Sequence, residues 1–434
     1  MHLENISLVF SNSENHVFDH PYLKALGRSG DRLVLPSPSE WVPLPRGSQI
    51  FSLPGRIPIG WDEIKKDFVF SERVKINGKD LVCTAVSAFL PPGYVRTLLP
   101  ATKMQSNAPI LPLWAYSCVG WKDGKFFVTG IMIDPNPHWD PKYFMNDKLL
   151  KSKVKILLRM KPKNRLIKQL SRCALEYHCF AAKNLFFQRW ECPLPTSPSC
   201  NAKCLGCISL QPSECCPASQ ERINFIPTIE EIVEVAVPHL NNAEDAIVSF
   251  GQGCEGEPLM QWRLLEQAIK KIRENTERGT INLNTNGSFP ERVKALCKAG
   301  LDSIRVTLNS ANKNLFNRYH RPIEFELKEV ISTLITAKEM GIYTSINLLV
   351  FPGVTDRETE IEKLIKFIQK TQIDLIQLRN LNIDPDLYLK IMGKGEGIGI
   401  PQMIKILKNE FSGLKFGYFN RTKKDFNKEY PFNF

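Results

Sequence analysis

Residues 200–207 read Cys200-Asn-Ala-Lys-Cys204-Leu-Gly-Cys207 and place three cysteines at C-x3-C-x2-C spacing. The flanking prolines Pro193, Pro195, Pro198 and Pro212 predict a loop here. Such a loop can turn all three thiols toward one point. Structural zinc takes four protein ligands, and a [4Fe–4S] cluster held only by protein takes four cysteines. Three thiols therefore predict a metal centre with one open position, where a substrate or cofactor would bind.

Downstream of the linker, the chain alternates short apolar runs with amphipathic stretches, which is typical of β–α units. The predicted strands are 185–190, 246–250, 280–284, 303–308, 343–351 and 374–379. The predicted helices are 228–240, with a capping box, and 260–277, 290–299, 326–340 and 358–370. Six such units with short connections require a parallel sheet. Periodicity alone does not decide between a doubly wound sheet and a barrel.

Polar segments follow three of these strands. Gly251-Gln-Gly-Cys-Glu-Gly-Glu-Pro-Leu259 comes directly after the second strand. Its glycines let the backbone approach a ligand closely, and a carboxylate there can accept hydrogen bonds from an ammonium group. The third strand ends in Asn284-Thr-Asn-Gly287 and the fourth in Thr307-Leu-Asn-Ser310. The plain alternative is that the Asn-Gly and Asn-Ser pairs are turn signals only.

The cysteine spacing, followed in order by these segments, resembles the radical S-adenosylmethionine (SAM) superfamily over roughly residues 186–380. The resemblance implies a [4Fe–4S] cluster held by Cys200, Cys204 and Cys207, with the amine and carboxylate of SAM on the fourth iron. It also implies an open (β/α)6 partial barrel of radical SAM type, with the cluster at the carboxyl ends of the strands. A mostly β amino-terminal domain would precede this α/β core.

The same resemblance implies which residues contact SAM. Gly256 and Glu257 match the end of the family's Gly-Gly-Glu motif, which contacts the SAM amino group. Candidates for the SAM carboxylate and ribose are Thr285, Thr307 and Asn309. The sequence departs from the family pattern at two positions. Glu255 replaces the first glycine of the motif, and Gly206 stands where an aromatic residue usually precedes the third cysteine.

We expect a radical SAM enzyme that cleaves SAM reductively to a 5′-deoxyadenosyl radical, which takes hydrogen from a substrate. An external electron donor is the expected partner. No motif identifies the substrate, so RNA, a peptide and a small molecule all stay open. The alternative is a non-enzymatic zinc module that binds nucleic acid, with Cys192 or Cys215 as the fourth ligand. Whether Cys215, Cys216 or Cys254 hold a second cluster also stays open, although no cysteine follows Cys297.

Composition is compatible with this function. The 434 residues predict two or three domains, and 43% hydrophobic with 24% charged residues is ordinary for a globular protein. No apolar run is long enough to span a bilayer, and the first residues lack the pattern of a secretion signal. The 12 cysteines are more typical of metal binding in a reducing compartment than of disulfides. We therefore expect a cytoplasmic protein with no membrane partner.

The chain divides by composition into four regions. We expect a mostly β domain at 1–145, a basic linker and helix at 146–184, the core domain at 185–380 and an extension at 381–434. The extension includes a predicted helix at 401–411 and a possible strand at 414–419. In the first region, Asp123-Gly124 predicts a hairpin turn.

The linker is strongly basic. Residues 147–172 hold ten lysines and arginines against one acid, Asp147, and a helix is predicted from Arg165 to about residue 182. We expect a solvated helix face. A polyanion-binding patch is the alternative, which the net charge of +12 admits.

Overall fold

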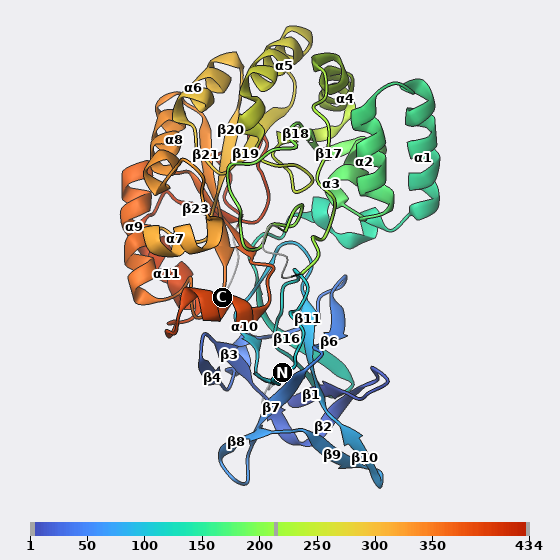
Figure 1. Cartoon of the computed structure of the whole chain (residues 1–434), viewed down its shortest axis with the longest axis vertical. Coiled ribbons are helices and arrows are strands. Elements are labelled where there is room, and N and C mark those ends of the chain that lie inside the picture. Colours follow the sequence, from blue (N-terminus) through green and yellow to red (C-terminus); the bar gives the residue numbers. More distant parts are fainter. Residues whose placement is uncertain (1–4, 212–215, 431–434) are drawn as a thin grey trace.

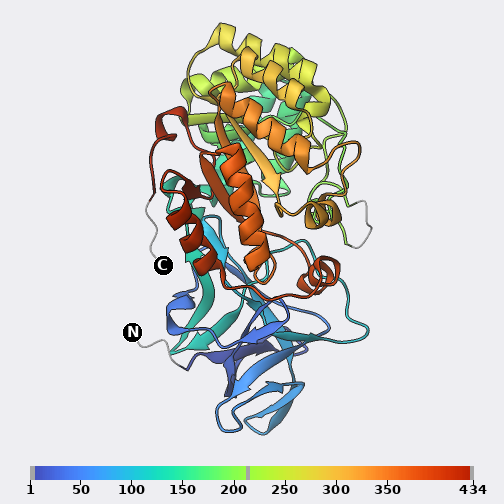
Figure 2. The ribbon, with the colours of Figure 1, turned by 90° about the vertical axis from the view of Figure 1, so that its left-hand side faces the viewer.

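The computed structural model describes residues 5–211 and 216–430. Figure 1 shows an amino-terminal β domain below and a parallel sheet wrapped by helices above it. Figure 2 shows from the side that the helices cover the outer face of this parallel sheet. In the described part of the chain, no helix combines the length and the apolar character needed to cross a bilayer.

The amino-terminal β domain is built from short antiparallel strands. The main path of its largest sheet runs β12-β16-β15-β1-β2-β7-β14. The hairpin of β15 and β16 is confirmed: Lys122 pairs with Lys125, and Asp123 and Gly124 both have positive φ. The strands are β1 (Ser7–Ser11), β2 (Val17–Ala25), β3 (Gly27–Ser29), β4 (Arg32–Val34), β5 (Trp41–Pro43), β6 (Gln49–Ser52), β7 (Arg56–Asp62), β8 (Asp67–Phe70), β9 (Arg73–Ile76), β10 (Lys79–Val82), β11 (Thr84–Phe89), β12 (Tyr94–Arg96), β13 (Leu99–Pro100), β14 (Thr102–Met104), β15 (Val119–Lys122) and β16 (Lys125–Met132).

Three helices connect this domain to the parallel sheet: α1 (Asp147–Met160), α2 (Arg165–Leu175) and α3 (Phe180–Phe187). The prediction of a single helix over 165–182 is wrong. The helix ends after α2, and His178, between α2 and α3, has a positive φ. The strand predicted at 185–190 is also wrong at its start. Leu185 and Phe186 form the buried last turn of α3, and the strand begins at Arg189. A short apolar run does not by itself distinguish a buried helix from a strand.

Acids distant in sequence neutralise part of the basic linker. Lys161 pairs with Glu234 at 2.8 Å, and Arg172 pairs with Glu221 at 2.6 Å. Arg165 likewise pairs with Glu231. Lys148, Lys151 and Lys155 on α1 stay exposed. The solvated face therefore remains our expectation for α1.

The parallel sheet has seven strands in the order β17-β18-β19-β20-β21-β22-β23, and every pairing is parallel. It curves into the expected half-barrel. The seventh strand is the possible strand of the carboxyl-terminal extension, which adds beside β22. The strands are β17 (Arg189–Pro193), β18 (Glu244–Phe250), β19 (Thr280–Thr285), β20 (Ser303–Leu308), β21 (Tyr343–Val350), β22 (Leu375–Asn380) and β23 (Lys415–Gly417).

Helices follow the strands and cover the outer face of the half-barrel (Figure 1). Outward-facing strand residues such as Ile304, Val306 and Leu308 are buried in one large apolar core. The capping box predicted at Thr228 and Glu231 is confirmed at the start of α4. The helices are α4 (Ile229–Asn242), α5 (Trp262–Asn275), α6 (Pro290–Ala299), α7 (Lys313–His320), α8 (Leu327–Glu339), α9 (Glu358–Thr371), α10 (Pro385–Met392) and α11 (Ile400–Glu410).

The amino-terminal β domain packs against the carboxyl ends of β21 and β22. The Arg96 guanidinium donates to the carbonyl of Leu381 at 2.8 Å, and the Arg96 backbone N–H donates to the side chain of Asn380 at 3.0 Å. Arg56 and Asp384 form an ion pair of 2.7 Å with both side chains at most 2% exposed. Ligand sites in parallel sheets lie at the carboxyl ends of the strands, so this domain borders the expected site.

Candidate cofactor site

The cysteine loop, residues 194–211, leaves the carboxyl end of β17 and is fastened to α7. The N–H of Leu205 donates to the carbonyl of Tyr319 at 2.9 Å, and the N–H of Lys203 donates to the carbonyl of His320 at 3.1 Å. The loop contains no helix or strand of its own, which confirms the prediction made from its prolines. Its shape therefore depends on these backbone bonds to α7.

The three thiols of the loop are close enough to interact electrostatically. Burial raises the pKa of Cys200 to about 11, and the Glu257 carboxylate is the next cause. Burial also raises the pKa of Cys204 well above its usual value, with the Cys200 and Cys207 thiols adding to the shift. Thiols held together in this way become thiolates when a bound cation offsets their charge.

The three sulfurs of the loop do not form a compact single-ion group in this structure. Among residues 5–211 and 216–430, they are not a group of ligand atoms that all lie within 4.8 Å of one another. In a tetrahedral zinc site the sulfurs would be about 3.8 Å apart, because each Zn–S bond is about 2.3 Å. Ligands of a [4Fe–4S] cluster bind different irons and stand further apart. The donor type, three thiols with one coordination position left open, therefore fits a cluster.

The Gly256-Glu257 segment runs beside the residues that lead into the cysteine loop. The N–H of Gly256 donates to the carbonyl of Ser197 at 2.7 Å, and the N–H of Glu257 donates to the carbonyl of Ser199 at 2.9 Å. A Cβ at residue 256 would lie 2.0 Å from the Ser199 oxygen, so only glycine permits this approach.

Glu257 is a buried carboxylate that links two of the predicted segments. Its oxygens accept hydrogen bonds from the Thr285 hydroxyl, from the Asn286 N–H at 2.7 Å and from the Leu259 N–H at 3.1 Å. Burial raises its pKa to about 7, and these donors act in the opposite direction. No basic side chain of the described residues forms an ion pair with it. A cationic ligand group would therefore find an acceptor here.

Glu255 has a positioning role that the sequence did not reveal. Its carboxylate accepts from the N–H groups of Thr196 and Ser197 at 2.8 and 2.9 Å, and from the N–H of Gly251. It thereby ties the start of the cysteine loop to the end of β18. The departure from the Gly-Gly-Glu pattern adds a buried connection between the two segments.

Gly206, the second departure from the family pattern, lies next to an aromatic residue of another element, Tyr319. A Cβ at residue 206 would lie 3.0 Å from the Tyr319 hydroxyl and 3.3 Å from the Asn382 carbonyl. Tyr319 belongs to α7 and is 4% exposed. A larger side chain at residue 206 would displace it, so the glycine and this tyrosine form one packing arrangement.

The remaining candidates lie on neighbouring strands. Thr285 and Val306 are directly paired between β19 and β20, which puts Thr307 one residue beyond the end of β19. Thr307 faces the inside of the half-barrel and is partly exposed. Asn309 is buried, and its amide donates to the Leu315 carbonyl at 3.3 Å, toward α7. The structure thus brings Glu257 and Thr285 together and places Asn309 further along the same edge.

The other cysteines that the structure describes do not supply a fourth ligand to the three thiols of the loop. Cys192 is fully buried in the apolar core, and burial raises its pKa with Glu191 and Cys179 as the nearby charges. Cys254 interacts with Cys173 through a thiol–thiol hydrogen bond. Cys216 is partly exposed, and Cys215 lies outside the described residues. A zinc site with Cys192 as its fourth ligand is therefore not favoured.

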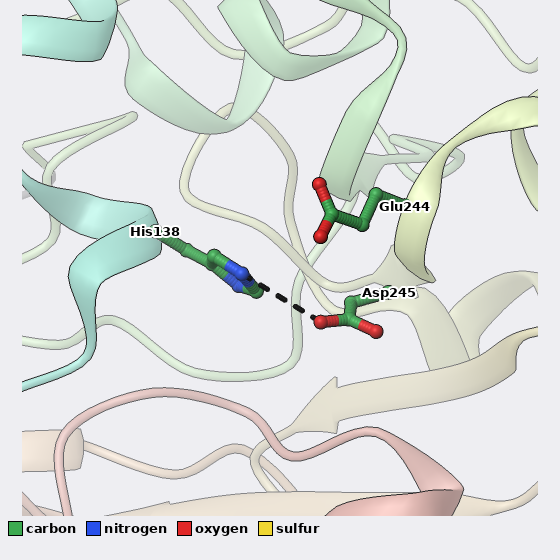
Figure 3. Close-up of side chains that lie close together, drawn as sticks. All are labelled: His138, Glu244 and Asp245. Atoms are coloured by element: carbon green, nitrogen blue, oxygen red, sulfur yellow. Dashed lines mark ion pairs between the residues drawn. The ribbon is translucent and has the colours of Figure 1, made fainter.

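A second group of ligand-type side chains lies at the amino end of β18, away from the cysteine loop. His138, Glu244 and Asp245 have atoms within 4.8 Å of one another, and Figure 3 shows the imidazole directed at Asp245. His138 Nε2 lies 3.6 Å from Asp245, and the Lys424 ammonium pairs with the same carboxylate. The Asp245 carboxylate is thus already paired with Lys424, and His138 and Asp245 line a cavity of about 240 Å³.

Comparison with known families and sequences gives a consistent result. Residues 194–368 match the family model described as Radical SAM superfamily. A GTP 3′,8-cyclase of Aquifex aeolicus is 30% identical over 227 residues, which is 49% of this chain and 62% of the relative. A probable GTP 3′,8-cyclase of Methanosarcina acetivorans is 27% identical over 52% of this chain and 63% of the relative. The chain thus spans less than two thirds of these relatives.

Solved structures are similar to this chain only at low identity. The SuiB protein of Streptococcus suis bound to S-adenosylmethionine has 14% identity and a TM-score of 0.38, over 59% of this chain and 55% of SuiB. Methylornithine synthase has 13% identity and a TM-score of 0.39, over 62% of this chain and 77% of that enzyme.

Proposed function

Because this chain is a member of the radical SAM superfamily, whose proteins bind a [4Fe–4S] cluster and SAM, we propose that it cleaves SAM reductively at the cysteine loop. The radical formed would then take hydrogen from a substrate. Cys200, Cys204 and Cys207 would hold the cluster, and Glu257 would receive the SAM ammonium group.

The observation that carries this proposal is the contact between the Gly256-Glu257 segment and the cysteine loop. The N–H groups of both residues bond to carbonyls of residues 197–199, immediately before Cys200. A ligand held by the carboxylate would therefore lie beside the three thiols.

The side chains of this site would bind and orient SAM. When bound, the cluster and SAM supply the electron transfer and the carbon–sulfur cleavage that yield the 5′-deoxyadenosyl radical. The Glu257 carboxylate would accept a charge-assisted hydrogen bond from the SAM amino group. The Thr285 hydroxyl and the Asn286 N–H hold that carboxylate in place. Thr307 and Asn309 remain candidates for the ribose and carboxylate.

For the substrate, GTP is the first compound to test, because the curated relatives are named GTP 3′,8-cyclases. The similarity covers about half of this chain. A peptide and other small molecules therefore remain to be tested beside GTP. RNA also remains to be tested, because α1 is basic.

The test is product analysis under anaerobic conditions. Reconstituted protein is incubated with SAM and dithionite, with and without GTP, and 5′-deoxyadenosine is measured by mass spectrometry. We expect 5′-deoxyadenosine from the wild type and none from the Cys204→Ala variant. Wild-type protein that has a full cluster and binds SAM but forms no 5′-deoxyadenosine would contradict the proposal.

A further inference from the structure

The inside of the half-barrel is polar, although strands of parallel sheets are usually apolar on both faces. Inward-facing positions alternate with buried apolar ones along β20, β21 and β22. Four of them, Thr307, Asn347, Leu349 and Arg379, are partly exposed, whereas these outward-facing residues are buried: Val306, Leu308, Ile346, Leu348, Val350 and Leu378. The partial exposure of these inward positions shows that solvent reaches the carboxyl half of the barrel interior on this side.

Two arginines face this interior from strands on either side of β21. Arg305 on β20 is 8% exposed, and its Nη1 donates to Gln377 of β22 at 3.1 Å, across β21. Arg379 on β22 donates through Nε to the Tyr418 carbonyl at 2.8 Å, and its guanidinium lies over the Tyr418 ring at 4.2 Å. The two side chains are thus held in fixed positions.

Neither guanidinium has an acidic partner. In residues 5–211 and 216–430, no carboxylate oxygen lies within 4.0 Å of Arg305 or Arg379. The buried Nε–H of Arg305 has no acceptor, and the Oδ1 of Asn347 on the intervening strand is also without a donor. A buried, unpaired donor of this kind costs free energy unless a ligand satisfies it.

The nearest acid inside the barrel is already engaged. Oε1 of Glu191 accepts hydrogen bonds from Ser249 at 2.7 Å, from Gln252 at 2.6 Å and from Asn420 at 2.7 Å. Burial and then the charge of Arg379 lower the pKa of Arg305 to about 9, while the charge of Glu191 acts in the opposite direction. The two guanidinium groups therefore lie within electrostatic range of each other.

We infer that Arg305 and Arg379 form an oxyanion-binding subsite for the substrate inside the half-barrel, with the amide of Asn347 between them. The ligand group is a phosphate or a carboxylate, because a planar guanidinium matches both in a bidentate pair. This inference rests on the proposed function, since it assumes that a substrate enters the barrel. It adds the requirement that the substrate carries a negatively charged group, which the cofactor-binding residues do not require.

Binding measurements on the anaerobic holoenzyme with SAM test the subsite. The probes are inorganic tripolyphosphate, citrate and GTP, with guanosine as the neutral probe, each titrated by calorimetry. We expect the wild type to bind at least one of the anions. Arg305→Gln and Arg379→Gln should each weaken anion binding about ten- to a hundredfold. Preference for tripolyphosphate would indicate a phosphorylated substrate, and preference for citrate a carboxylate.

The matched control is Arg263→Gln on the exposed surface of α5, which should leave anion binding unchanged. Arg379→Lys keeps the charge and should recover part of the loss. Unchanged SAM affinity shows that each variant is folded. Wild-type protein that binds none of the three anions, or equal weakening by Arg263→Gln, would overturn the subsite. SAM cleavage without substrate is measured separately, so failure of the subsite is distinguishable from failure of the proposed function.

Discussion

The Thr285 hydroxyl donates a hydrogen bond to the Glu257 carboxylate, which joins the end of β19 to the loop after β18. In sequence these residues belong to separate segments, 28 positions apart. Their contact places a buried acceptor beside the cysteine loop with no basic partner of its own. The account of SAM binding depends on this pair more than on any other contact.

Replacement of Glu257 by Ala should weaken SAM binding and leave the iron in place. A charge-assisted hydrogen bond contributes about 1.5–3 kcal/mol, so SAM affinity should fall about ten- to a hundredfold. Thr285→Val removes a neutral donor and should cost about two- to tenfold. Equilibrium dialysis and iron analysis check both variants. SAM affinity in Glu257→Ala equal to that of the wild type would show that the segment is misassigned.

Cluster assembly should depend on the three loop cysteines only. Cys200→Ala, Cys204→Ala and Cys207→Ala should each lose most of the bound iron, because each removes one ligand. Cys216→Ala is the matched control, since this residue is outside the cysteine loop, and it should keep its iron. Iron and sulfide analysis after anaerobic reconstitution decides. A Cys204→Ala protein with full iron would refute the ligand assignment.

The buried ion pair of Arg56 and Asp384 should stabilise the contact between the amino-terminal β domain and the half-barrel. Arg56→Met leaves an uncompensated buried carboxylate, which costs about 3–5 kcal/mol. Arg73, paired with Asp80 on the surface, is the control, and Arg73→Met should change the free energy of unfolding far less. Denaturant unfolding measures both. Equal effects of the two substitutions would argue against a buried pair.

His239 should make stability depend on pH. Burial lowers its pKa from 6.5 to about 4, and its ring contacts the Trp190 carbonyl. Because the folded pKa is the lower one, the unfolded chain takes up the proton first as pH falls. Stability should therefore be full above pH 6.5 and decrease between pH 6.5 and about 4.

His239→Gln keeps a donor for Trp190 but does not titrate in this range, so its unfolding free energy should vary less with pH. The exposed His16→Gln variant serves as control and should follow the wild type. Urea unfolding of the cluster-free proteins between pH 5 and 8 gives the comparison. Parallel pH profiles for wild type and His239→Gln would remove His239 as the cause.

The sequence predicted the half-barrel and the segments around the cofactors because each has a local signal. The thiols of 200–207 share one short loop, and Gly256-Glu257 directly follows a strand. The contact of Glu255 with Thr196 and Ser197 has no such signal, since 58 or more residues separate the partners. The helix α3 was mistaken for a strand because Leu185 and Phe186 are apolar in either structure.

A signal for the barrel interior was present but not used. Ser303-Ile-Arg-Val-Thr307 and Gln377-Leu-Arg379 alternate polar and apolar residues within strands of a parallel sheet. Both faces of such strands are usually apolar, so this alternation indicates a polar interior. The sequence does not show that Arg305 and Arg379 lack an acidic partner in the described part of the chain. This depends on the three-dimensional arrangement, in which Glu191 accepts hydrogen bonds from other side chains.

The most direct test of the central claim is the electron paramagnetic resonance spectrum of the reduced, reconstituted protein before and after SAM is added. A cluster with one open iron should give a signal that changes when SAM binds in the wild type and not in Glu257→Ala. A colourless protein that holds zinc, or a cluster signal that SAM leaves unchanged in the wild type, would contradict the account.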